Sequence, residues 1–158
     1  MIQGKNETGA VEVSMNTLVY NDDVLESLAA IILLGSRPSA KSAGELPGLK
    51  KVLYDYDIYM LSFQSDKDVE ALCKTIQKNG LRPTDKKLKE KLLAIRDNAR
   101  TFVSIAESHN SVRAFIDKTR GGGDDGLVVL TAAFTGKKCE YPLKLLGPAA
   151  CKKFLSQF

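Results

Sequence analysis

The sequence predicts a mainly α-helical fold: a single compact domain of about five to seven helices, with room for a small β-hairpin near 127–146. The chain has 158 residues, and its 44% hydrophobic residues are enough to fill one core without a metal or a disulfide. Most of the apolar residues recur at helical spacing, three and four positions apart. Serine, aspartate or proline precedes several of these runs and glycine or asparagine follows them, as at the starts and ends of helices.

Residues 1–20 are predicted to form an N-terminal arm or a short strand before the helical domain at 21–158. Between positions 10 and 20 apolar and polar residues alternate, which is typical of a half-buried strand. The arm lacks a basic start followed by an apolar core, so we expect no secretory signal. No uncharged apolar run approaches the roughly 20 residues of a membrane span. We therefore expect an intracellular protein, cytoplasmic or nuclear, without a membrane span.

The first predicted helix is almost wholly apolar and is expected to lie in the core. It starts at Asp23, which forms a capping-box-like pair with Glu26, and it ends at Gly35. Residues 36–48 contain two prolines, two glycines and three serines, and they are predicted to form a loop. The apolar residues of 49–63 match both helical and strand spacing, and we favour a helix.

Two amphipathic helices are the clearest elements of the sequence. The first starts after Ser65, a residue that can cap it, and it stops at Gly80. The second opens at Pro83 and extends to about Asn110; at roughly 25 residues it would be about 38 Å long at 1.5 Å per residue. A helix of this length can serve as the spine of a bundle. Its apolar face consists of Leu88, Leu92, Ile95, Ala99, Phe102, Val103 and Ala106.

The last part of the chain is predicted to contain a short helix from Ser111, a glycine-rich connector, two apolar segments and a final helix. The apolar segments, 127–134 and 139–146, fit a β-hairpin, although the first also fits a buried helix. Pro142 restricts the second segment to an edge or a bulge. Pro148 suits the first turn of the final helix, whose apolar stripe must be covered by the core or by another copy, and we favour the core. That stripe consists of Cys151, Phe154, Leu155 and Phe158.

The glycine run TRGGGDDGLVVL, at 119–130, has the composition of a phosphate or metal site. A phosphate loop, however, places its glycines after a strand and before a helix, whereas here a helix precedes them and a strand is expected to follow. Asp124 and Asp125 would repel a phosphate, and a metal would need a third oxygen ligand at a defined spacing. We therefore predict a flexible connector at 119–126 that supplies no metal ligand.

No catalytic residue, metal or cofactor is predicted. His109 is the only histidine, and it lies near the expected end of the long helix with no nucleophile motif in reach. Cys73, Cys139 and Cys151 are odd in number and widely spaced, so they fit neither a disulfide framework nor a zinc site. We expect reduced, partly buried thiols.

Basic residues are the strongest functional signal. The net charge of +4 permits an acidic partner such as nucleic acid without requiring one. One group of candidate nucleic-acid contacts lies opposite the apolar face of the long helix, and a second lies in the last 22 residues. Acidic residues interleave with the first group, so an ordinary solvated face is the alternative. The candidates are Lys86, Lys87, Lys91, Arg96 and Arg100 in the first group and Lys137, Lys138, Lys152 and Lys153 in the second.

Three tyrosines form a candidate partner-binding surface. Tyr54, Tyr56 and Tyr59 cluster beside the acidic residues Asp55 and Asp57. Tyrosines can stack on a ligand or contact a protein partner through an apolar ring and a polar hydroxyl. The alternative is that they are half-buried at the edge of an element.

The segments KLLAIRDNARTFVSI, at 91–105, and LLGPAACKKFLSQF, at 145–158, make up 29 of the 158 residues. They resemble two helices of the bacterial 3-methyladenine DNA glycosylase family, a helical base-excision fold. The resemblance implies a helical, DNA-binding ancestry. The catalytic carboxylate, the tryptophan-containing motif and the Cys/His zinc set of the family have no match here, and LGSRPS at 34–39 lacks an acid where the resemblance needs one. No catalytic residue is carried over.

These observations predict a non-enzymatic binding or assembly module. It is expected to contact nucleic acid, either RNA or DNA, or to self-associate as a homo-oligomer in a nucleoprotein-like assembly. One alternative is a helical base-excision DNA glycosylase-like enzyme or a degenerate relative of one. Another is a protein–protein adaptor domain.

Overall fold

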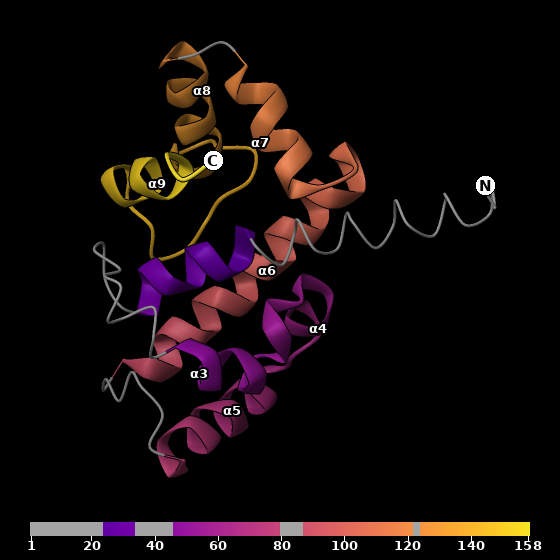
Figure 1. The fold of residues 1–158 in the computed structure, drawn as a ribbon, viewed down its shortest axis with the longest axis vertical. Coiled ribbons are helices and arrows are strands. Elements are labelled where there is room, and N and C mark those ends of the chain that lie inside the picture. Colours follow the sequence, from indigo (N-terminus) through magenta and orange to yellow (C-terminus); the bar gives the residue numbers. More distant parts are fainter. Residues whose placement is uncertain (1–23, 34–45, 80–86, 122–123) are drawn as a thin grey trace, which may run out of the picture.

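Helix α6 (Leu88–His109) is the spine of the fold. The computed structural model describes residues 24–33, 46–79, 87–121 and 124–158. Its single compact, mainly helical arrangement confirms the predicted fold class (Figure 1). α6 has 22 residues and is about 33 Å long at 1.5 Å per residue. Its predicted apolar face is buried, apart from the half-buried Val103. Three helices that pack against it are α4 (Ile58–Ser62), α5 (Asp66–Lys78) and α7 (Val112–Arg120).

The apolar helix predicted at the start of the helical domain lies in the core, at 24–33. Eight of its ten residues are buried. Glu26 is half-buried, and its carboxylate pairs with the ammonium of Lys50 at 2.8 Å. Lys50 belongs to α3 (Leu46–Val52), so this ion pair joins α3 to the core helix.

The loop predicted at 36–48 is wrong for its last three residues, which belong to α3. Pro47 lies in the first turn of that helix, where a missing backbone N–H breaks no helical hydrogen bond. The remainder of the loop lies outside the described residues. The arm or strand predicted at 1–20 and the helix start predicted at Pro83 lie outside them as well.

The segment 49–63 is helical, as its sequence favours, but it is not one helix. A short 3-10 turn, η1 (Tyr54–Tyr56), separates α3 from α4. Its three residues have φ angles of 57°, 56° and 60°, a left-handed backbone that residues other than glycine rarely adopt. Asp57 then starts α4, because its carboxylate accepts hydrogen bonds from the N–H groups of Tyr59 at 2.8 Å and Met60 at 3.1 Å.

Capping residues begin α5 and α7 where the sequence predicts them. The Ser65 hydroxyl accepts the N–H of Asp68 at 3.1 Å, and the Asp68 carboxylate accepts the N–H of Ser65 at 2.9 Å. Asn110 has a φ of 76° and follows the last residue of α6. Ser111 then starts α7 by accepting the N–H of Ala114 at 2.9 Å.

The connector predicted at 119–126 is wrong for five of its residues, which are helical, while Gly122 and Gly123 lie outside the described residues. Thr119 and Arg120 are the last residues of α7, and α8 (Asp124–Thr135) begins within the run. A Cβ atom on Gly126 would lie 2.7 Å from the carbonyl oxygen of Arg120 and 2.8 Å from that of Thr119. Glycine is needed there because α8 approaches the end of α7 so closely.

α8 takes the place of the first strand of the hairpin expected near 127–146. The helical alternative for its apolar segment is confirmed, and the hydroxyls of Thr131 and Thr135 donate to carbonyl oxygens one turn earlier at 2.8 Å each. After Gly136 the chain turns back along α8. The N–H of Tyr141 donates to the carbonyl oxygen of Ala133 at 3.0 Å, and the N–H of Leu143 donates to that of Phe134 at 3.1 Å. Those carbonyls have no partner within the helix, so these bonds complete its end.

The connector at 137–147 is held against α6 by Asn98. The buried Asn98 amide donates to the carbonyl oxygen of Lys144 at 3.2 Å, and its oxygen accepts the N–H of Lys144 at 2.7 Å. The Thr101 hydroxyl donates to the carbonyl oxygen of Pro142 at 3.1 Å. Side chains of α6 and backbone carbonyls of α8 thus satisfy backbone groups of the connector, and no hairpin forms because its expected first strand is helical.

α9 (Pro148–Leu155) packs its apolar stripe into the core of the same chain, as favoured from the sequence. Burial raises the pKa of the Cys151 thiol to about 12. α7 also holds the end of α9, because the Arg120 guanidinium donates to the carbonyl oxygen of Leu155 at 2.6 Å. The buried residues of the stripe are Cys151, Phe154 and Leu155.

Candidate interaction surface

Arg96, predicted to lie on the exposed basic face of α6, is buried. Its side chain is 8% exposed. The guanidinium donates to Asp66 and Asp97 at 2.8 Å each and to the carbonyl oxygen of Gln64 at 2.9 Å. These bonds join α6 to the start of α5. The assignment of Arg96 to nucleic-acid binding is therefore wrong, because the group could reach a phosphate only by breaking them.

The other basic residues of α6 make a smaller surface than predicted. Arg100 is exposed, yet it donates to two carbonyl oxygens around the end of α4, at 2.9 and 3.3 Å. Lys87 is exposed and Lys91 is half-buried, whereas Lys86 lies outside the described residues. α6 starts beside α3 and α5, away from α8 and α9 (Figure 1). The lysines at this end of α6 are thus separated from those of the C-terminal group.

Asp97 is the centre of the charge network around Arg96. The Lys144 ammonium donates to its carboxylate at 2.7 Å. Burial alone would raise the pKa of Asp97, but the hydrogen bonds and charges of Lys144 and Arg96 outweigh burial and lower it. A hollow of about 560 Å³ beside the network is lined by charges of both signs, so it presents no field of one sign to a ligand.

Only two of the three candidate tyrosines reach the surface. Tyr56 is fully buried, so its assignment to partner binding is wrong. Burial, with a contribution from Glu26, raises the pKa of its phenol well above the ordinary range, and its hydroxyl has no hydrogen-bond partner among the described residues. Tyr54 is 38% exposed and Tyr59 is half-buried. The tyrosine surface is therefore small.

His109 has a structural position at the end of α6. Its Nε2 lies 3.1 Å from the hydroxyl of Tyr141, and its ring centroid is 4.7 Å from that of Phe115. The rings of Phe115 and Tyr141 meet edge to face at 5.3 Å. This aromatic cluster joins α6, α7 and the connector, which supports a helix-end role for His109 rather than a catalytic one.

An apolar groove lies on the surface between α8 and α9. Its volume is about 570 Å³. Val128 on its wall is 60% exposed, and the neighbouring Val129 is 58% exposed. Exposed apolar side chains beside a groove are typical of a surface that contacts a partner. The residues that line this α8–α9 groove are Val128, Thr131, Ala132, Thr135, Gly136, Pro148, Ala149 and Lys152.

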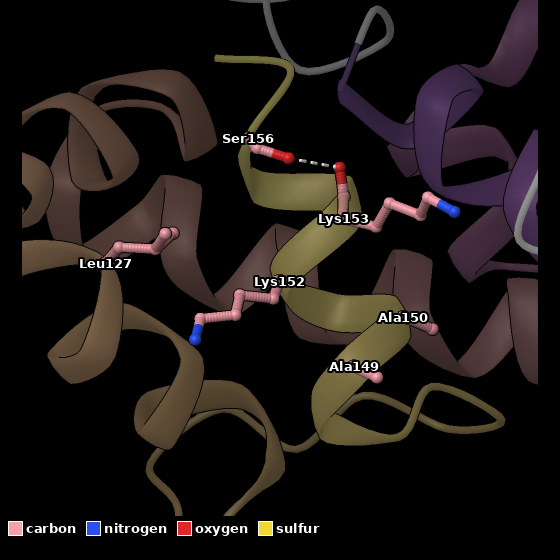
Figure 2. A pocket seen from close by; sticks show the side chains of 6 residues that line it. All are labelled: Leu127, Ala149, Ala150, Lys152, Lys153 and Ser156. Carbon is pink, nitrogen blue, oxygen red and sulfur yellow. Dashed lines mark hydrogen bonds between the residues drawn. The ribbon is translucent and has the colours of Figure 1, made fainter. Parts of the chain in front are cut away.

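Of the C-terminal lysines predicted from the sequence, Lys152 lines this groove and Lys153 follows it on α9. A second hollow of about 480 Å³ adjoins it and shares Ala149 and Lys152 with it. Figure 2 shows Lys152 extending from α9 on the side of Leu127 and Lys153 extending from the other side. Two further lysines come directly after Gly136, where the groove ends. All four are exposed and form no ion pair with a described residue: Lys137, Lys138, Lys152 and Lys153.

The part of the chain that the structure describes contains neither a cluster of metal ligands nor a helix that could span a membrane. No three His, Cys, Asp or Glu side chains there come together as a metal site requires. The glycine run precedes a helix rather than the expected strand, but Asp125 places negative charge in the first turn of α8, where an anion would bind. No helix among these residues combines the length and apolar character needed to cross a membrane.

A second exposed apolar feature lies between α4 and α5. Phe63, which follows α4, is 81% exposed, and Met60 is 45% exposed. Residues 54–70 around them contain five carboxylates and one lysine. We call Met60, Phe63 and the unpaired carboxylates of this segment the acidic end. The carboxylates that form no ion pair with a described residue are Asp55, Asp57 and Asp68.

Neither exposed apolar feature is among the surfaces predicted from the sequence. For Val128 a signal was present, because the segment 127–134 is apolar on every side and carries no charge. Such a helix must be buried all round or expose an apolar face. For Phe63 no local signal distinguishes an exposed ring from a buried one, and the structure leaves it 81% exposed.

Comparison with known proteins gives no relative for this chain. No protein-family model, no curated protein and no solved structure matches it. The function must therefore be argued from the surface itself.

Proposed function

We propose that this protein is a non-enzymatic binding and assembly module whose partner binds at the α8–α9 groove. The observation that carries this proposal is an exposed apolar groove with lysine and no carboxylate among the described residues that line it. The apolar wall favours contact because its area leaves water. The lysines favour a partner with acidic groups and exclude a basic one.

Binding is favoured over catalysis by the state of the reactive side chains. The single histidine lies against Tyr141 in an aromatic cluster. Cys73 and Cys151 are buried, and burial keeps the thiol of Cys151 protonated near neutral pH. The glycosylase-like enzyme and the intracellular location stay predictions from the sequence.

Nucleic acid is a second candidate partner, supported by the four exposed lysines around the groove. Lysines can neutralise phosphates whatever the base sequence. The described lining of the groove, however, contains no aromatic ring on which a base could stack. The Arg96 guanidinium is also unavailable to a phosphate, because it is buried and forms ion pairs with Asp66 and Asp97. These features favour an acidic protein surface over a nucleic acid.

The proposal is tested by replacing the four groove lysines with glutamine. Self-association is measured by sedimentation velocity, and binding to nonspecific RNA and DNA by fluorescence anisotropy, both at low salt. We expect the native chain to show at least one interaction and the variant to lose about tenfold or more in affinity. The changes are Lys137→Gln, Lys138→Gln, Lys152→Gln and Lys153→Gln.

A matched control carries glutamine at four exposed lysines on α3, α5 and α7. It should bind like the native chain. Equal binding by the groove variant and the native chain would rule out this surface. If nucleic acid is the partner, affinity should fall with a log–log salt slope of several units, and the groove variant should flatten that slope. The control positions are Lys51, Lys74, Lys78 and Lys118.

A further inference from the structure

We infer that the partner of the α8–α9 groove is a second copy of this chain, which inserts Phe63 of its acidic end into the groove. This inference rests on the proposed function, because it uses the same groove. It predicts a head-to-tail contact between two unlike surfaces of the same molecule.

The charges of the two surfaces are complementary. Residues 54–70 contain five carboxylates and one lysine, and residues 127–158 contain five lysines and one glutamate. Internal ion pairs use part of each set: Asp66 pairs with Arg96, and Lys144 pairs with Asp97. The remaining charges still oppose one another: three carboxylates at the acidic end form no ion pair with a described residue, although Asp57 and Asp68 cap helices, and four C-terminal lysines form none either. Opposite exposed charges steer two surfaces together and penalise the contact of like with like.

The apolar parts of the two surfaces also fit one another. Phe63 projects from the acidic end at 81% exposure, with Met60 beside it at 45%. The groove is lined by small side chains such as Ala132 and Ala149, which leave room for a ring. Its volume of about 570 Å³ lies within the roughly 300–1,000 Å³ of pockets that enclose compact groups. An aromatic side chain in such a pocket is a typical anchor of a protein interface.

The positions of the two surfaces require a second molecule. α5 and α8 lie at opposite ends of the long axis of the fold (Figure 1). A chain therefore cannot place its own Phe63 in its own groove. A contact between unlike surfaces leaves one free surface at each end of a pair, so further copies add until a ring closes or a filament forms.

The test uses two variants that each remove one surface. Phe63→Ser removes the anchor and leaves the groove intact. Ala132→Glu places an acidic side chain in the groove and leaves the anchor intact; Ala132 is an exposed helical position, and glutamate is a good helix former. Ser104→Glu, at an exposed position of α6, is the matched control. Urea denaturation shows that each variant remains folded.

Sedimentation velocity over a wide concentration range at low salt gives the result. The mass of the native chain and of the control should rise with concentration. Each single variant should associate about tenfold or more weakly, the usual effect of losing an interface anchor. An equimolar mixture of the two variants should form a one-to-one complex and nothing larger, because one anchor and one groove remain intact. Salt should weaken every complex.

Three outcomes would overturn the inference: a native chain that stays monomeric, a closed dimer that both variants leave unchanged, or a mixture that forms no complex. If the native chain is monomeric but its groove lysines still bind nucleic acid, the inference fails and the proposed function stands. If neither self-association nor lysine-dependent binding occurs, both fail.

Discussion

Arg96 and Lys152 carry the same charge and were assigned the same role from the sequence, yet their surroundings differ completely. Arg96 lies on the spine helix and donates to two carboxylates and a backbone carbonyl. Lys152 lies on a peripheral helix, borders an apolar groove and has no ion-pair partner among the described residues. A cation on a helix that is packed on several sides becomes part of the structure. One on an outer helix stays available to a partner.

The difference comes from the neighbouring elements rather than from the helices that carry the charges. α6 packs against α5 and the connector, which bring Asp66 and Lys144 to its polar face. α9 packs against α8, whose residues from Leu127 to Thr135 carry no charge. The number of lysines and arginines in a sequence therefore does not show how many of them are exposed and free of ion pairs.

The largest expected effect tests whether α9 belongs to the core of its own chain. Phe154 is fully buried. Phe154→Ala should lower the free energy of unfolding by about 3–5 kcal/mol, because it empties a buried phenylalanine site. Urea denaturation measures the loss. Phe63→Ala, compared at a protein concentration low enough to keep the chain monomeric, is the matched control, and because Phe63 is exposed it should change stability by less than about 0.5 kcal/mol.

If Phe154→Ala kept the stability of the native chain, α9 would not belong to the core of its own chain. α9 would then dock on another copy, and its lysines would lie inside an interface. Sedimentation of the same variant separates the two cases, since a docked α9 predicts a loss of mass and a core α9 predicts a loss of stability.

A smaller effect is expected from the charge network on the spine helix. The pKa of Asp97 is lowered in the folded chain, so its bonds stabilise the fold above the ordinary carboxyl value of 3.8 and are lost as the pH falls through the lowered pKa. Asp97→Asn should lower the free energy of unfolding by about 1–3 kcal/mol near neutral pH. The difference from the native chain should shrink at acid pH.

Urea denaturation near neutral pH and at acid pH measures this pH dependence. Asp117→Asn is the control, because the Asp117 carboxylate forms an exposed pair with Arg113 at 3.2 Å and should contribute less than about 1 kcal/mol. A difference for Asp97→Asn that stays constant over this pH range would show that the network does not set the pKa of Asp97.

The smallest expected effect on stability is that of replacing the two lysines of α9. The double variant Lys152→Gln and Lys153→Gln should change the free energy of unfolding by less than about 0.5 kcal/mol, because neither ammonium has an ion-pair or hydrogen-bond partner among the described residues. Thermal or urea denaturation checks this. A clear loss of stability would mean that these lysines are structural, as Arg96 is.

Local rules predicted the elements of this fold well wherever a single residue decides the outcome. Ser65 and Ser111 cap their helices, Asn110 follows the end of the spine, and Pro148 begins α9. Each of these choices depends on bonds within one helical turn, which a sequence displays directly.

The remaining features depend on contacts between distant segments. The connector is held against α6 by the hydrogen bonds between the Asn98 amide and the backbone of Lys144, which is 46 positions away in the sequence. The burial of Arg96 depends on Asp66, 30 positions away. Because aspartate often caps helices, the interruption of the helix at Asp57 can be inferred from the sequence. The left-handed backbone of the three residues before it cannot, because none of them is glycine. The candidate groove is likewise a product of packing, since neither α8 nor α9 contains it alone.

The close approach at Gly126 has a consequence for recognising relatives of this chain. A Cβ on Gly121 would meet its nearest backbone atom at 3.5 Å, which is ordinary contact, whereas one on Gly126 would lie 2.7 Å from the carbonyl oxygen of Arg120. Selection should therefore tolerate alanine or serine at the first position and reject both at the second. A distant relative would be recognised by a fixed glycine at position 126, whereas position 121 would be free to vary.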